Sequence, residues 1–153
     1  MKVAEALALR ADAARRIEQL KARIVANARF QEGEEPSEDP AALLTEAAEA
    51  LDELESLIRR INRTNAAAVI GPEGTLTDAL AARDTLRLRH AVVTAAANAA
   101  AGGPHNRQLR SELKMLTALP VTDLRAQADA LARRIRELDT HIQRANWEVD
   151  LLD

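Results

Sequence analysis

Residues Val121 to Leu152 read VTDLRAQADALARRIRELDTHIQRANWEVDLL, and this stretch decides the fold. Its apolar side chains recur at steps of three and four, at Leu124, Ala128, Leu131, Ile135, Leu138, Ile142, Ala145, Val149 and Leu152. Because an α-helix turns once every 3.6 residues, that spacing places all of them on one face. Thr122 and Asp123 are typical of a helix N-terminus. We therefore predict one amphipathic helix over residues 122–151.

A second stretch of the same kind lies upstream and has a clear start. Asp39-Pro40 is typical of a helix N-terminus, with aspartate as the N-cap and proline at the first helical position. We predict a helix over residues 40–64. Its expected buried seam is a heptad pattern of Leu44, Ala47, Leu51, Leu54, Ile58 and Ile61. Leu57 widens the apolar face beyond this seam, which implies more than one neighbour.

Two further helices are predicted over residues 2–28 and 77–101. The first has an apolar stripe that consists of Leu9, Ala13, Ile17, Leu20 and Ile24. Gly33 breaks that pattern and opens a polar loop. Thr75 or Thr77 can cap the other helix, with Asp78 favourable near its start, and the helix stops at the Gly-Gly-Pro sequence of residues 102–104.

Two connections carry weaker signals of extended structure. Residues 69–75 read VIGPEGT, which indicates a turn between two short arms, too little for a stable hairpin alone. The apolar spacing of residues 109–119 suits either a short helix or a short strand. We favour an extended piece that pairs with the 69–75 region. A minor β element is therefore expected in these connections.

The composition agrees with an all-α protein. Aromatic residues make up 1% of the chain, whereas sheets favour aromatic and β-branched residues. Four stripes of matched length predict a single helical domain, residues 1–153, built as an antiparallel four-helix bundle. The alternative is a coiled-coil hairpin that completes its core by dimerising. Alanine-rich stripes bury little area per residue, so we expect a homo-oligomer, most simply a dimer.

Composition also excludes several classes of function. The chain has no cysteine, which excludes disulfides, thiolate zinc sites and a cysteine nucleophile. The net charge of −3 argues against nucleic acid as a partner. We find no signal-peptide pattern and no stretch suited to spanning a bilayer. A cytoplasmic protein without nucleic-acid or membrane partners is the expectation.

The histidines and serines form no recognisable catalytic or metal site. His90, His105 and His141 lack the paired Glu-x-x-His spacing of a di-metal helical bundle. His90 lies on the apolar stripe of the third helix and is interpreted as a core or interface residue. His141 is expected to be exposed beside the seam of the last helix. We therefore predict no catalytic residue, no metal and no cofactor.

Three other residues are candidates for a polar core or an interface. Arg83-Asp84 interrupts the stripe of the third helix, either as an ion pair that sets helix register or as a ligand-anchoring arginine. Trp147 lies near the end of the last helix. It is interpreted as an aromatic plug there, or as the anchor of an oligomer contact, since tryptophan is common at interface hot spots.

The charge distribution suggests two interaction loops. No basic residue occurs between Gln31 and Glu55, and the loop there includes Gln31, Glu32, Glu34 and Glu35. Acidic and basic faces on neighbouring helices explain this pattern, and a patch for a partner or a cation is the sharper hypothesis. A basic segment with Arg107, Arg110 and Lys114 is the other candidate loop.

Several short strings along nearly the whole chain resemble those of one family. They include Asn27-Ala28, Gln31-Glu32-Gly33-Glu34, Ile61-Asn62-Arg63-Thr64-Asn65, Thr75-Leu76-Thr77-Asp78-Ala79-Leu80, Arg83-Asp84, Ser111-Glu112-x-Lys114, Glu137-Leu138-Asp139-Thr140 and Asn146-Trp147. Together they resemble the septicolysin-like family of small bacterial helical proteins. The resemblance implies an all-helical fold and supplies no catalytic residue. This chain departs from the family pattern at residues 104–110, where members tend to carry a tyrosine.

Three hypotheses about function follow from the sequence. The leading one is a non-enzymatic, self-associating interaction protein that presents one of its charged loops to a protein partner. The second is a membrane-active, cytolysin-like protein, which the family name suggests and which the lack of a basic amphipathic face opposes. The third is a small-ligand carrier or enzyme with a polar spot in the bundle core, lined by Arg83, Asp84 or His90.

Overall fold

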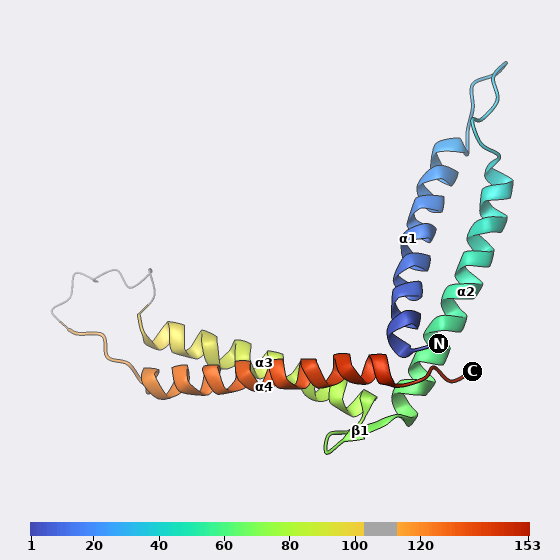
Figure 1. The fold of residues 1–153 in the computed structure, drawn as a ribbon. Helices are drawn as coiled ribbons and strands as arrows, with labels where there is room; N and C mark the ends of the chain where they lie inside the picture. The colour runs from blue at the N-terminus through green and yellow to red at the C-terminus, as the bar shows by residue number, and fades with distance from the viewer. Residues whose placement is uncertain (103–112) are drawn as a thin grey trace. The chain divides into compact units, whose positions relative to one another are not determined.

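The computed structural model describes residues 1–102 and 113–153, and it consists almost wholly of helices (Figure 1). In chain order the elements are α1 (Val3–Asn27), α2 (Pro40–Ala67), β1 (Val69–Gly71), β2 (Gly74–Thr75), α3 (Leu76–Ala100) and α4 (Val121–Glu148). The all-α prediction is confirmed. The predicted helix bounds agree with these to within three residues at each end, because caps and breakers lie where the sequence indicates them.

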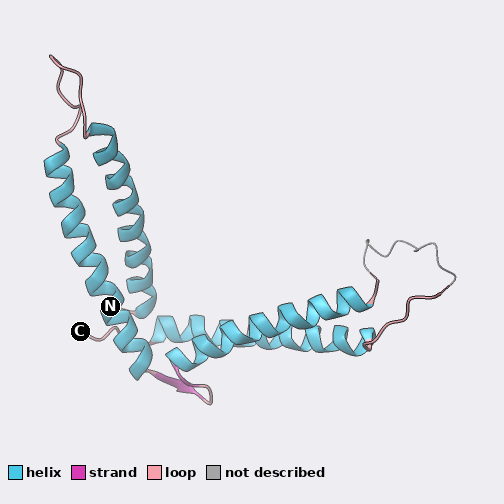
Figure 2. Ribbon diagram, turned by 180° about the vertical axis from the view of Figure 1, so that it is seen from behind, coloured by secondary structure: helices cyan, strands magenta, loops and turns pink. Residues whose placement is uncertain are grey.

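The chain divides into two compact units. Unit 1 contains residues 1–69 and 144–153, and unit 2 contains residues 70–143. In unit 1, α1 and α2 form an antiparallel hairpin, and in unit 2, α3 lies antiparallel to α4 (Figure 2). Each unit is thus built on a pair of long antiparallel helices.

The core of unit 1 lies between α1 and one edge of α2. Its buried α2 residues are spaced by seven, at Leu43, Ala50 and Leu57, with Ile61 completing the row. On α1 the matching buried residues are Val3, Ala6, Ala13 and Leu20. Two clusters result, one around Leu20 and Leu43 and the other around Val3, Leu57 and Leu151.

The seam predicted for α2 is partly wrong. Leu44, Leu51 and Ile58 remain 58%, 50% and 38% exposed, and the buried row is the one that precedes each of them by one residue. The physical reason is the width of the apolar face: a single partner helix covers only one edge of it. We call these three residues the α2 stripe.

The C-terminal end of unit 1 is tied to both of its long helices. The N–H of Leu151 donates to the carbonyl of Met1 at 2.8 Å, and Lys2 pairs with Asp150 in an isolated β-bridge. The N–H of Leu152 donates to Oγ1 of the buried Thr64 at 2.9 Å. These extended backbone contacts end α4 at Glu148, three residues before the predicted end.

Unit 2 begins with a small β-hairpin. β1 pairs with β2, and the turn between them uses Gly71 and Gly74, both with positive φ. The minor β element predicted for residues 69–75 is therefore present. In the second connection residues 109–112 lie outside the described residues, and residues 113–119 form no strand. Because these glycines allow a tight turn, β1 pairs with β2, the strand that directly follows it in the chain.

Candidate functional site

The predicted Arg83–Asp84 pair belongs to an ion network that links α3 to α4 within unit 2. Arg83 Nε donates to Asp84 Oδ1 at 3.1 Å, and Arg83 also lies 3.7 Å from Asp139 of α4. Arg87 donates to the same Asp139 carboxylate at 3.0 Å. Because two arginines converge on one carboxylate from the facing helix, this network favours the register-setting interpretation over a ligand anchor.

The histidines have different environments. His90 is half-buried on α3, and His105 lies outside the described residues. His141 is half-buried, not exposed as predicted, and its Nε2 lies 2.5 Å from the carbonyl oxygen of Ile70. Since a carbonyl oxygen only accepts, Nε2 donates the proton in this bond. The contact holds the β-hairpin against α4, and sequence reasoning missed it because the partner is a backbone atom 71 positions away.

A polar groove of about 570 Å³ runs along the α3–α4 pair. Its charged lining residues are Glu73, Arg89, Arg134 and Glu137, with His141 at one wall and Leu86, Leu131 and Leu138 among its apolar residues. Arg133 forms an ion pair with Glu137 at 3.1 Å. The lining thus mixes both signs of charge and holds no serine or cysteine nucleophile. Within the described ranges no three histidine or acidic residues are grouped to hold a metal ion.

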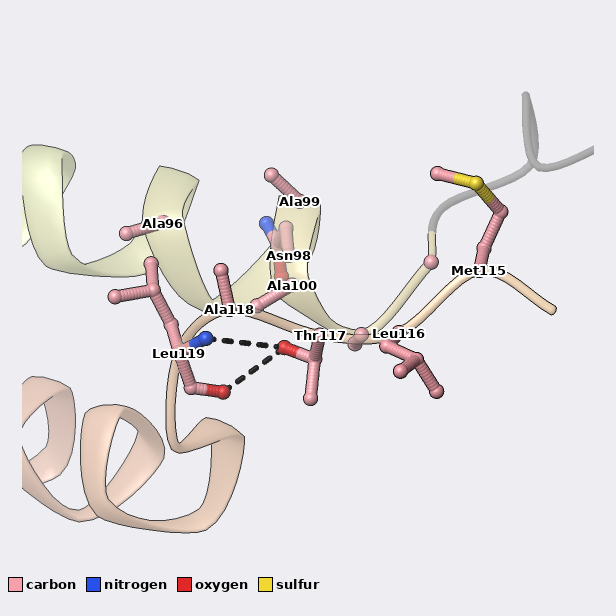
Figure 3. A pocket seen from close by; sticks show the side chains of 11 residues that line it. Ala96, Asn98, Ala99, Ala100, Met115, Leu116, Thr117, Ala118 and Leu119 are labelled. Atoms are coloured by element: carbon pink, nitrogen blue, oxygen red, sulfur yellow. Dashed lines mark hydrogen bonds between the residues drawn. The ribbon is translucent and has the colours of Figure 1, made fainter.

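A second, more apolar pocket of about 760 Å³ lies at the end of α3 (Figure 3). It is lined by Ala96 and residues 98–102 on one side and by residues 115–119 on the other. The hydroxyl of Thr117 donates to the carbonyl of Leu119 at 2.9 Å and holds the loop in a tight turn. Met115 and Leu116 are largely exposed. The predicted loop residue Lys114 is also exposed, whereas Arg107 and Arg110 lie outside the described residues.

The predicted acidic loop lies between α1 and α2. Gln31, Glu32, Glu34 and Glu35 are all exposed. The loop is anchored at its far end by Glu38, whose carboxylate forms a bidentate pair with Arg23 of α1. Its N–H donates to Oδ1 of the buried Asn27 at 3.0 Å. The hydrogen bond from Arg23 holds the pKa of Glu38 below its ordinary value.

Trp147 is 63% exposed, so it is not a core plug. Its ring belongs to an apolar patch of unit 1 that also includes Met1, Ala4, Ala8 and Leu9. The hot-spot alternative from the sequence therefore fits this exposed position better. Unit 1 therefore exposes large apolar side chains both at this patch and along the α2 stripe.

The most extended feature on the surface of α2 is the row of exposed apolar side chains that forms the α2 stripe. The α2 stripe extends over two heptads, about 21 Å of helix at 1.5 Å per residue. Three large aliphatic side chains at intervals of seven follow the heptad spacing of coiled-coil seams. A separate observation concerns membranes: through residues 1–102 and 113–153, no helix combines the length and apolar character that a bilayer span requires.

Three comparisons place the chain among known proteins. The model of a family described as a family of unknown function (DUF6847) matches residues 10–151. A crystal structure of a functionally unknown conserved protein from Corynebacterium diphtheriae is 38% identical, with a TM-score of 0.88. That match covers 99% of this chain and 99% of the other. Among curated proteins, none matches the chain.

Proposed function

The chain belongs to the DUF6847 family of unknown function, and we propose that it is a non-enzymatic protein that associates with a second copy of itself. One observation carries the proposal: the α2 stripe is a heptad row of large apolar side chains left exposed beside a fully packed row. A water-exposed row of this kind is unfavourable in an isolated chain and favourable at an interface.

The free energy gained by burying the α2 stripe limits how tightly two copies can associate through it. Fully burying an aliphatic side chain contributes about 1.5–3 kcal/mol, and the stripe residues are already half-buried, so each contributes about 1 kcal/mol more. Association itself costs about 4–15 kcal/mol. Two stripes alone therefore support only weak association, and a stable dimer requires further complementary contacts.

Light scattering coupled to size exclusion tests the proposal. We expect the wild-type chain to elute as an oligomer whose mass falls on dilution. Leu51→Glu places a charge in the middle of the stripe and is expected to give a monomer that keeps its helical circular-dichroism spectrum. Val25→Glu is the matched control, because Val25 is exposed on α1 outside the stripe. A wild-type chain that stays monomeric at high protein concentration contradicts the proposal.

For the location and the partners of the protein, the proposal keeps the expectations from the sequence. We place the protein in the cytoplasm, with no nucleic-acid partner, and its acidic loop at Gln31 to Glu35 is free to contact a protein partner. The septicolysin-like resemblance remains a prediction beside this proposal.

A specific observation favours one second candidate, contact with a membrane surface. Met115 and Leu116 are 73% and 84% exposed and follow the cationic Lys114 in one loop. Apolar side chains beside a cation suit the boundary of an anionic bilayer. Vesicles that contain anionic lipid test this by co-sedimentation and dye leakage, with Met115→Glu as the negative control. Absence of both binding and leakage rejects this candidate.

A further inference from the structure

Residues 149–153, which we call the strap, lie along unit 1 beside the first residues of the chain. The N–H of Val3 donates to the carbonyl of Val149 at 3.1 Å, and the N–H of Leu151 donates to the carbonyl of Met1 at 2.8 Å. The bridge between these two bonds is antiparallel. Residues 1–3 therefore pair with the strap as the edge of a sheet pairs with an added strand.

The last turns of α2 bind the other backbone groups of the strap. Oγ1 of the buried Thr64 accepts the N–H of Leu152 at 2.9 Å. The same hydroxyl donates to the carbonyl of Arg60 at 2.8 Å, which fixes its orientation. Arg60 Nε in turn donates to the carbonyl of Leu152 at 3.1 Å. Two N–H groups and two carbonyls of the strap are thus paired with the rest of unit 1.

The side chains of the strap make fewer contacts than its backbone. Leu151 is the buried one, and it joins the apolar cluster of Val3, Ala6, Leu57 and Ile61. On either side of it, Asp150 forms an ion pair with Lys2 at 2.8 Å, and Asp153 forms one with Arg60 at 3.0 Å. These contacts select a leucine that has an acidic residue just before it and another two positions after it.

Such an arrangement is typical of peptide recognition by strand addition, in which backbone hydrogen bonds supply affinity and side-chain pockets supply specificity. We propose that this part of unit 1, the strap site, recognises an extended segment of a partner protein with the pattern Asp-Leu-x-Asp. The strap itself occupies the site in the isolated chain and competes with the partner. This inference goes beyond the proposed self-association and does not depend on the α2 stripe.

The strap is held less firmly than the helices around it. It contributes one buried residue, Leu151, whereas α1 and α2 each contribute five. Its ion pairs lie at the surface, where such pairs add little stability. Segments with few buried contacts open at a lower free energy than the helices of a core. An opened strap leaves its backbone partners and the apolar cluster accessible to another segment.

A labelled peptide and the full-length chain test the proposal. The probe is a fluorescein-labelled peptide with the sequence of residues 146–153, NWEVDLLD, and its binding is measured by fluorescence anisotropy. In the protein, Leu151→Asp places a charge in the apolar cluster and releases the strap, so we expect saturable binding of the peptide. Leu152→Asp is the matched control, because that side chain is 47% exposed and only its backbone binds Thr64.

The wild type and the Leu152→Asp control keep the strap in place. We expect them to bind the peptide roughly tenfold more weakly, or not at all, because a tethered segment competes at a high effective concentration. A second peptide, with aspartate in place of its buried leucine, is expected not to bind any of the proteins. If Leu151→Asp keeps its helical circular-dichroism spectrum and binds no peptide, the proposal is overturned. Equal binding to the wild type places the peptide elsewhere and also overturns it.

Hydrogen exchange in the wild-type chain, followed by NMR, keeps the proposal testable when Leu151→Asp does not fold. We expect the amides of Leu151 and Leu152 to exchange together and faster than those of Leu57 and Ile61, which are buried on α2. Exchange of all four amides at one rate means that the strap opens only when the whole unit unfolds. That result overturns the proposal.

Discussion

At the residue scale, the start of α3 depends on a few local hydrogen bonds. The N–H and the hydroxyl of Thr75 both donate to Asp78 Oδ2, at 2.9 and 2.8 Å, and the N–H of Asp78 donates back to Thr75 Oγ1. A reciprocal capping box of this kind can be recognised in a sequence, because its signature is a capping threonine with an acidic residue three positions later. Gly74 adjoins the box with a φ of +94°.

Gly74→Ala is expected to destabilise unit 2. An alanine Cβ there meets Asp78 Oδ2 at 2.7 Å, so the capping carboxylate must move, and the positive φ adds backbone strain. We expect a loss of about 1–3 kcal/mol in the free energy of unfolding, measured by urea denaturation. Gly33→Ala is the matched control, because Gly33 has a φ of +89° and no atom within 4 Å of its added Cβ. An equal loss in both variants contradicts a role for the capping box.

Asp78 also makes stability depend on pH. Hydrogen bonds from the Thr75 backbone and side chain hold the pKa of Asp78 below its ordinary value. A carboxyl group with a lowered folded-state pKa stabilises the fold above its unfolded pKa of about 4 and loses this contribution as the pH falls further. Asp78→Asn is therefore expected to lower the Tm at pH 7 and to approach wild type once the pH falls below the lowered pKa of Asp78 in the folded state. A Tm difference that persists unchanged at low pH contradicts this assignment.

At the scale of elements, α2 has an apolar face wider than one partner covers. The caps, Asp39 at the start and the bond from the N–H of Ala68 to the carbonyl of Thr64 at the end, are local features. The Asp39 cap explains why the start of α2 was predictable, whereas its end at Ala67 lies three residues beyond the predicted one. The choice of buried row was not predictable, because Leu43, Ala50 and Leu57 differ from the α2 stripe by a rotation of one residue. Contact with α1 decides between them.

Leu57→Ala and Leu51→Ala are expected to differ in their effect on the free energy of unfolding, because Leu57 belongs to the buried row of α2 and Leu51 to the exposed row. Leu57 is buried in the unit 1 core, so truncation leaves a cavity and costs about 2–5 kcal/mol of unfolding free energy. Leu51→Ala removes a half-exposed side chain and is expected to cost about 1 kcal/mol or less within one chain. Urea denaturation at several protein concentrations measures both. Concentration dependence that disappears in Leu51→Ala indicates association through the stripe.

At the scale of the whole molecule, the chain presents acidic and basic regions on different helices while its net charge is only −3. Apolar burial is insensitive to moderate salt, whereas interactions between exposed charges are screened over about 10 Å at 0.1 M ionic strength and about 3 Å at 1 M. The proposed association through the α2 stripe involves apolar side chains on a helix that also carries exposed carboxylates such as Asp52. Its salt dependence therefore reports the share that the charges contribute.

The sequence by itself determined where the four helices lie, because helix periodicity, caps and glycine breaks act over three or four residues. It also indicated, through Leu57 beside the seam of Leu51, that the apolar face of this helix is wider than one partner helix covers. Only the tertiary structure decided which α2 row is buried, that His141 holds the carbonyl of Ile70, and that Trp147 is exposed. Each of these depends on packing between side chains and backbone distant in sequence, and no local pattern encodes such a choice.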